Sequence, residues 1–159
     1  MKIKRTLSLA LIYFIFANCF SSTIYASDIE KIISTDIIYY ENGDYVTIET
    51  KSVISSARLS KSNNSYTKTY TYRDSNGVAQ WDYKLTASFS YDGSNSSCTS
   101  VTDSYSIYDS NWHIDSHSCS RDGNRAVGSF TMKRKYLGVT TKTISDSITM
   151  VCSPNGNIS

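Results

Sequence analysis

The sequence has one proline, two histidines and no block of acidic or basic residues. It has no Gly-x-Ser-x-Gly motif, which excludes the turn that presents the nucleophile of many serine hydrolases. It also lacks an internal repeat of solenoid length. β-branched and aromatic residues dominate its patterned segments, and 13 of its residues are tyrosines. This composition is typical of a folded antiparallel β-protein and not of a disordered chain.

The N-terminus has the pattern of a secretory signal peptide. It begins with three basic residues: Lys2, Lys4 and Arg5. A mostly apolar stretch follows from residue 7 to 20, and the small residue Ala26 precedes Ser27 at the expected cleavage point. We therefore expect residues 1–26 to be removed on export, so that the mature protein is secreted and meets a membrane only through this peptide.

Two other interpretations of this N-terminal segment are disfavoured by its residues. A membrane anchor is disfavoured because the apolar stretch is shorter than the span of about 20 residues that a bilayer requires, and Asn18 interrupts it. A lipid-modified Cys19 is disfavoured because Asn18 is a poor residue before a lipidation site.

The charge balance depends on this segment. The whole chain has 16 basic and 14 acidic residues, and cleavage after Ala26 removes three basic residues and no acidic one. The mature chain therefore has 13 basic against 14 acidic residues. Because that balance provides no basic surface, we expect no nucleic-acid partner.

The stretch Ala79–Tyr91, AQWDYKLTASFSY, alternates strictly between two kinds of residue. Every odd position is apolar or aromatic, and every even position is polar. Successive side chains of a strand point to opposite faces of a sheet. The alternation therefore predicts a long strand with one buried and one solvated face.

Turn residues divide the rest of the chain at near-regular intervals. Five of the seven glycines mark these breaks, at positions 43, 77, 93, 123 and 138. Strands joined by short polar turns predict an all-β fold, an antiparallel β-sandwich of about eight strands, with a barrel-like arrangement as the alternative. We expect a hairpin and a Ser/Asn-rich loop over residues 27–65 and the main β domain over residues 66–159, together forming one folded unit.

The N-terminal hairpin is predicted from an Asn-Gly turn. It joins residues 37–40 to residues 45–50, and Asn42-Gly43 supplies the positive φ that tight hairpin turns need. Residues 27–35 carry a hint of helix, with a disordered segment or an edge strand as the alternatives.

The mature chain has three cysteines, an odd number for an exported protein. Cys98 and Cys152 both have the parity of inward-facing strand residues, and we expect a disulfide between them. A pairing of Cys119 with either of the other two is the alternative. With Cys119 left over, a Cys119-linked dimer is a further expectation.

The segment 112–120, WHIDSHSCS, offers a metal-binding pattern. On a regular strand His113, Asp115, His117 and Cys119 would all line one face, and these are ligand types that zinc or copper accepts. Alternate residues of one strand lie about 6.5–7 Å apart, so a closed site needs ligands from a neighbouring strand. The other interpretation, which we favour, is a solvated polar face and a protein without a cofactor.

The tyrosines of the segment 66–72 suggest a binding surface. Tyr66, Lys68, Tyr70 and Tyr72 share one face of a strand and, if exposed, would form an amphipathic platform for a glycan or a protein. The alternative, which we favour, is that this is the inward face, because Thr67, Thr69 and Thr71 are better suited to solvent.

Several motifs spread over residues 67–159 carry a resemblance: KTYTY at 68–72, Trp81, KLTASFSYDGSNSSCTS at 84–100, Trp112, the turn at 123–128, LGV, and ITMVCSPNG at 148–156. In these motifs the chain resembles a group of small, uncharacterised secreted proteins of Gram-positive anaerobic bacteria. The resemblance implies export and fold, and it implies that cysteines matching Cys98 and Cys152 are usual whereas Cys119 is a departure. It implies no function.

No catalytic set stands out from the sequence, so we expect a non-enzymatic exported protein that binds a glycan or protein partner in the cell envelope or outside the cell. The first alternative is a secreted metal-dependent protein or hydrolase that uses the face from His113 to Cys119. The second is a bacteriocin-like or toxin-like effector.

Overall fold

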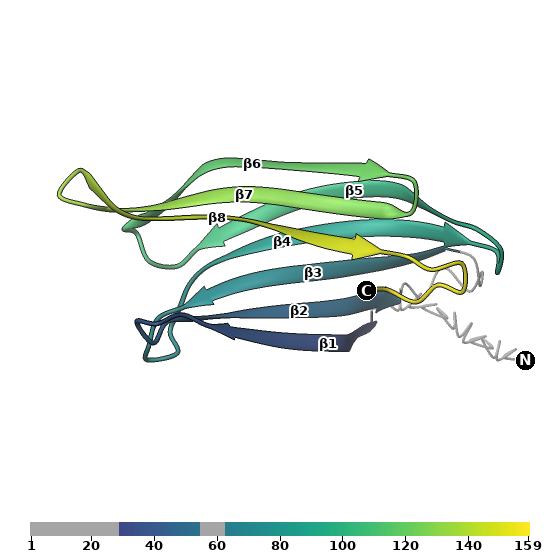
Figure 1. Cartoon of the computed structure of the whole chain (residues 1–159), viewed down its shortest axis with the longest axis horizontal. Coiled ribbons are helices and arrows are strands. Elements are labelled where there is room, and N and C mark those ends of the chain that lie inside the picture. Colours follow the sequence, from purple (N-terminus) through teal and green to yellow (C-terminus); the bar gives the residue numbers. More distant parts are fainter. Residues whose placement is uncertain (1–28, 55–62) are drawn as a thin grey trace, which may run out of the picture.

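The structure is a computed structural model that describes residues 29–54 and 63–159 (Figure 1). The expected signal peptide, its cleavage point at Ala26 and Ser27, and most of the Ser/Asn-rich loop lie outside these residues. The described part contains eight antiparallel strands: β1 (Ile29–Tyr39), β2 (Tyr45–Ile54), β3 (Asn63–Arg73), β4 (Ala79–Tyr91), β5 (Ser96–Ile107), β6 (Trp112–Asp122), β7 (Arg125–Tyr136) and β8 (Val139–Val151).

The strands form two packed sheets, which confirms the predicted all-β sandwich. One sheet has the order β1-β2-β3-β4-β5, and the other has the order β6-β7-β8. Each strand pairs with its neighbour in sequence except where the chain crosses from β5 to β6, so the fold is a meander with one crossing between sheets. Within the described residues, no helix is long and apolar enough to span a bilayer.

Strand β4 spans the residues that the alternation predicts, and the hint of helix before residue 36 is wrong. Ile29 to Tyr39 form one long strand, because its residues pair with β2 along almost their whole length. Pairing with a neighbouring strand outweighs the weak local preference for helix. The edge-strand alternative is therefore the correct one.

Aromatic rings fill the space between the sheets. Trp81 of β4 stacks between Tyr70 and Tyr72 of β3, with ring centroids 5.6 and 5.4 Å apart. Trp112 and Phe130, from the other sheet, meet the Trp81 ring edge-on at 5.8 and 5.5 Å. These contacts join the two sheets through one continuous core.

The two sheets differ in width. Strands β6, β7 and β8 pack over β5, β4 and β3 (Figure 1). Strands β1 and β2 extend the five-stranded sheet beyond β8, and adjacent strands lie about 4.8 Å apart, so the overhang is about 10 Å wide. This overhang shapes the candidate site below.

Candidate binding site

The predicted tyrosine platform is buried, so its prediction as an exposed binding surface is wrong. Tyr66, Tyr70 and Tyr72 are each no more than 4% exposed, and they face the core of the sandwich. Lys68, between them, is half-buried and donates a hydrogen bond from Nζ to the carbonyl oxygen of Thr149 at 2.8 Å. The inward-face alternative is confirmed, because large aromatic side chains gain most from burial.

The predicted metal face is divided by a β-bulge. The pairing of β6 with β7 shifts between Ile114 and Ser116, so the strand's parity changes there. Before the bulge His113 pairs with Lys133, and Lys133 Nζ lies 2.9 Å from the Asp115 carboxylate. The expectation that all four residues share one face is therefore wrong.

Beyond the bulge, His117 and Cys119 face the core side of the sheet, because they pair with the inward-facing Phe130 and Gly128. Across residues 29–54 and 63–159, no three His, Cys, Asp or Glu side chains are grouped closely enough to hold a metal ion. The four predicted ligands are thus not brought together.

His117 instead bonds to an aspartate of the other sheet. Its Nδ1 lies 2.8 Å from Oδ2 of Asp103, which also accepts a 2.9 Å hydrogen bond from the Tyr83 hydroxyl. Burial opposes ionisation of Asp103, but the hydrogen bonds from His117 and Tyr83 outweigh it and lower its pKa below the usual value. The side chain of Asp103 is only 12% exposed.

The cysteine beside this pair is not an activated nucleophile. Burial, followed by the nearby charge of Asp103, raises the pKa of the Cys119 thiol. A thiol whose pKa is raised is held in its protonated, unreactive form. The His117–Asp103 pair joins β6 of one sheet to β5 of the other.

The predicted disulfide is not formed in this structure. Cys98, Cys119 and Cys152 are all free thiols, and Cys98 and Cys152 are buried. The backbone N–H of Cys98 donates to the Gly123 carbonyl at 2.8 Å, and that of Cys152 donates to the Asn124 carbonyl at 3.0 Å. Both cysteines are thus anchored to the same turn, between β6 and β7.

The overhang of β1 and β2 exposes side chains that point toward the core side of the sheet. Asp36 pairs with Ile48, and Ile48 pairs with the buried Tyr70. Partners directly across neighbouring strands share a face of the sheet. Ile38 pairs with the buried Val46 and therefore shares this face, yet its side chain is 49% exposed. We call this set the open face: Ser34, Asp36, Ile38 and Ile48.

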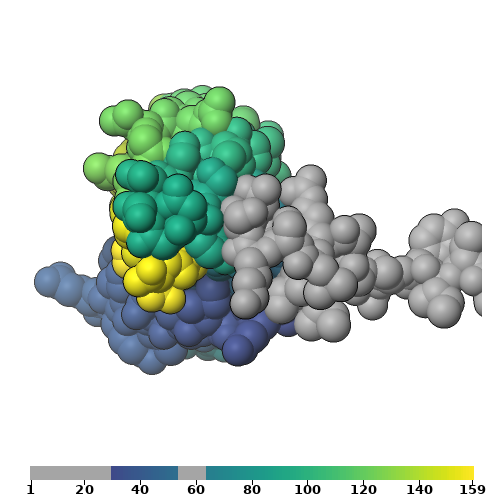
Figure 2. All heavy atoms as spheres, turned by 90° about the vertical axis from the view of Figure 1, so that its right-hand side faces the viewer, coloured from purple at the N-terminus to yellow at the C-terminus, as the bar shows by residue number. Residues whose placement is uncertain are grey.

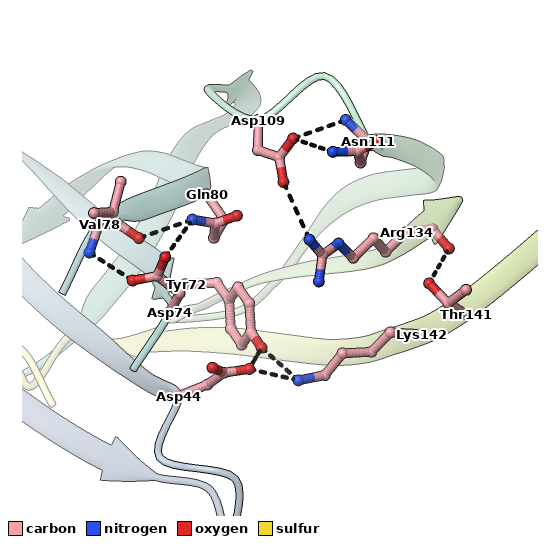
Figure 3. Close-up of polar contacts among 10 residues, drawn as sticks. All are labelled: Asp44, Tyr72, Asp74, Val78, Gln80, Asp109, Asn111, Arg134, Thr141 and Lys142. Atoms are coloured by element: carbon pink, nitrogen blue, oxygen red, sulfur yellow. Dashed lines mark hydrogen bonds and ion pairs between the residues drawn. The ribbon is translucent and has the colours of Figure 1, made fainter. Parts of the chain in front are cut away.

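Two lysine contacts join β8 to the wider sheet and bracket the open face. At one end Lys68 reaches the Thr149 carbonyl, and burial lowers its pKa. At the other end Lys142 of β8 reaches Asp44, in the turn between β1 and β2, at 2.9 Å (Figure 3). The open face thus lies beside β8 between two polar bridges.

The Asp44 bridge is a compact polar cluster (Figure 3). The Tyr72 hydroxyl and Lys142 both donate to the Asp44 carboxylate, and Asn42 donates to it at 2.6 Å. Partial burial opposes ionisation of Asp44, but these hydrogen bonds outweigh it and lower its pKa to about 2. The Lys142 ammonium also lies over the ring of Tyr72, 4.9 Å from its centroid.

We expect Asp44→Asn to lower the free energy of unfolding by about 2 kcal/mol at pH 7. The pKa of Asp44 is depressed in the folded state, so its stabilisation is present above pH of about 4 and is lost as pH falls toward about 2. The difference between wild type and variant should therefore shrink across that window. Urea unfolding at pH 7 and at pH 2.5 measures it.

Asp122→Asn is the control, because Asp122 is exposed in β6. Its effect should stay within about 0.5 kcal/mol at both pH values. If Asp44→Asn lowers the free energy of unfolding equally at both pH values, the depressed pKa of Asp44 is contradicted.

The C-terminal residues pair with the end of β8. Val151 and Ser159 exchange two backbone hydrogen bonds of 3.0 and 3.1 Å, and Cys152 forms a bridge with Ile158. The Tyr66 hydroxyl donates to the Gly156 carbonyl at 3.0 Å. Figure 2 shows this tail, in yellow, between the teal and green part of the molecule above it and the blue part below it.

A groove of about 500 Å³ lies between this tail and the ends of β1, β2 and β3. Its lining includes Lys31, Ser52, Tyr66 and Ile158. The groove adjoins the open face, because Lys31 pairs with Ser52 and Ser52 pairs with Tyr66 along the same inward row.

Sequence reasoning missed the open face. The sequence carries one signal for it, the isoleucines at positions 32, 33, 37 and 38, which are too many for one buried face of an edge strand. All four are at least 45% exposed. Neither a family model, nor a curated protein, nor a solved structure matches this chain.

Proposed function

We propose that the protein is an exported, non-enzymatic binding protein whose ligand, a glycan or a protein of the cell envelope or its surroundings, docks on the open face. The observation that carries this proposal is the difference in width between the sheets, which leaves apolar and charged side chains of the inward face in contact with solvent. An exposed apolar patch rimmed by polar groups is typical of an interaction site.

The chemistry of the described residues supports binding more than catalysis. His117 and Cys119 of β6 are engaged with Asp103, and burial and Asp103 raise the pKa of the Cys119 thiol. The open face offers two isoleucines, one free carboxylate and the hydroxyl of Ser34. These groups suit recognition through contact and hydrogen bonding.

A pair of adjacent isoleucines tests the proposal. Ile38 lies on the open face and is 49% exposed, whereas Ile37 points to the opposite face of β1 and is 51% exposed. We expect Ile38→Asp to weaken binding at least tenfold, and Ile37→Asp to leave it nearly unchanged. The measurement is binding of the mature protein to glycan and envelope-protein arrays, with a chelator present.

Binding that disappears with the chelator would instead favour a metal-dependent protein. Equal loss of binding in both isoleucine variants would show that the open face is not the docking surface.

We also propose that Cys98 and Cys152 form a disulfide in the exported protein. Their shared attachment to one turn supports this pairing, as does the influence of Cys98 on Cys152, whose pKa is raised by burial and then by Cys98. An oxidising compartment would favour the bond. The bond between Cys98 and Cys152 would close a loop of about 55 residues, and it would stabilise the fold by about 4 kcal/mol on the chain-entropy account.

Alkylation of the secreted protein under denaturing conditions, followed by intact mass, measures the pairing. One added alkyl group before reduction and three after it are expected, with the single accessible thiol at Cys119. Three added groups before reduction would refute the disulfide, and a reducible dimer would make Cys119 an assembly contact.

A further inference from the structure

We propose that the edge of β8 that faces away from β7 and the open face together bind one isolated extended segment of a partner polypeptide, which pairs with β8 as an additional strand. The inference rests on the proposed function and specifies its ligand as a polypeptide. It starts from the hydrogen-bonding groups along β8.

Alternate backbone groups of β8 point away from β7. Val151 uses its outward N–H and C=O to pair with Ser159, and the outward carbonyl of Thr149 accepts the Lys68 ammonium. The outward N–H of Ser147 bonds to the side chain of its own neighbour, Asp146, at 2.7 Å. These contacts take the place of the hydrogen bonds that a neighbouring strand would make, since β8 has only β7 as a strand partner among the described residues.

The path of the added strand is already begun by the chain itself. Ser159 runs antiparallel to β8 opposite Val151, and a segment continuing along that line would meet Thr149, Ser147 and Ser145 in turn. Ser145 and Ser147 are exposed. A strand in this position would lie over β2, with alternate side chains directed at Ile38 and Ile48.

A second copy of the protein does not fit this position by antiparallel pairing of the two β8 strands. Antiparallel pairing of β8 with the β8 of another copy would extend the narrow sheet, but each copy's wide sheet overhangs by two strands, about 10 Å, into the space that the other copy's wide sheet requires. A strand without a second sheet beneath it avoids this collision. The overhang therefore selects a single extended segment.

The charges beside the open face indicate what that segment contains. Asp36 and Asp146 are exposed and form no salt bridge with a described residue, whereas Lys142 is already paired with Asp44. Strand pairing provides affinity, and the side chains of alternate residues provide specificity. The expected segment has β-branched residues at alternate positions and a basic residue that reaches one of these carboxylates.

The first test supplies such a strand within the chain. An eight-residue extension of alternating valine and threonine is appended after Ser159 of the mature protein, in two versions shifted by one residue. The shift reverses which residues face Ile48. We expect the version with valines inward to slow amide exchange of Ser145 and Ser147 at least tenfold and to raise Tm, and the shifted version to do much less.

Equal exchange in both versions and in the unextended protein would overturn the proposal. Strong protection of these two amides before any extension would also overturn it, because the edge would then be occupied already.

The second test identifies the partner class. A display library of random linear twelve-residue peptides is selected against the mature protein, and the enriched peptides are measured against Ser147→Pro and Ser147→Thr. Proline removes one outward N–H of an edge strand without breaking its pairing with β7, whereas threonine retains it. We expect at least a tenfold loss of binding with Ser147→Pro only.

Peptides that bind Ser147→Pro as well as wild type but lose binding to Ile38→Asp would overturn strand addition and leave the proposed function standing. Peptides that bind both variants as tightly as they bind wild type would refute strand addition and the proposed function. A concentration-dependent dimer in sedimentation, abolished by Ser147→Pro, would show that the occupant is a second copy and would overturn the proposal.

Discussion

Replacing Trp81 by alanine is expected to lower the free energy of unfolding by about 3–5 kcal/mol. Trp81 is fully buried, and its ring is stacked between Tyr70 and Tyr72 while Trp112 meets it edge-on from the other sheet. Alanine would remove the contacts on both faces of the ring, and the stacked tyrosines, fixed in β3, cannot close the cavity. Urea denaturation followed by far-UV circular dichroism measures the loss.

The control for this variant is an exposed aromatic residue. Tyr136 is 66% exposed near the end of β7, so Tyr136→Ala should change stability by no more than about 0.5 kcal/mol. Since a domain of this size is stable by about 5–15 kcal/mol, Trp81→Ala removes a large fraction of its stability. A cost below about 1 kcal/mol would show that the aromatic stack is not the centre of the core.

Gly128→Ala is expected to cost about 1–3 kcal/mol, although it adds only a methyl group. A Cβ at this position in β7 would lie 2.5 Å from the Tyr83 hydroxyl oxygen and 3.0 Å from the Leu85 side chain. The hydroxyl cannot move freely, because it is held by Asp103 at 2.9 Å and by the Ser118 carbonyl at 3.3 Å. The methyl group would therefore push the two sheets apart or break these hydrogen bonds.

A double-mutant cycle separates this clash from a general intolerance of β7. Tyr83→Phe removes the hydroxyl and, by itself, costs about 1 kcal/mol for the lost hydrogen bond. In that background Gly128→Ala should cost at most half of its original value, because the closest atom is gone. Strict additivity of the two changes would show that the hydroxyl does not cause the cost.

Local pattern was sufficient to predict most strands. The alternation of Ala79–Tyr91 predicts β4 with its observed bounds, and its apolar positions, such as Trp81 and Phe89, are buried. The turns at Gly77 and Gly93 were predictable for the same local reason, since each requires a positive φ that glycine adopts without strain. Such features depend only on neighbours in sequence.

The candidate site was not predictable, because each of its parts depends on which strands lie opposite one another. The bulge after Ile114 is set by the register of β6 on β7, and it separates His113 from His117 although both have the same parity in the sequence. The burial of Asp103 depends likewise on Tyr83 and His117, which come from two different sheets. No alternation along one strand contains this information.

The sequence by itself determined the all-β class, most of the strands and the turns between them, and it favoured the inward direction of Tyr66, Tyr70 and Tyr72, because each follows from the two-residue period of a strand and from the residues that break it. Only the tertiary structure decided that the strands divide into five and three. That division results from where the chain crosses from β5 to β6, and it depends on packing between distant segments. Within residues 29–54 and 63–159 it leaves β1 and β2 without a covering strand, and so it creates the open face.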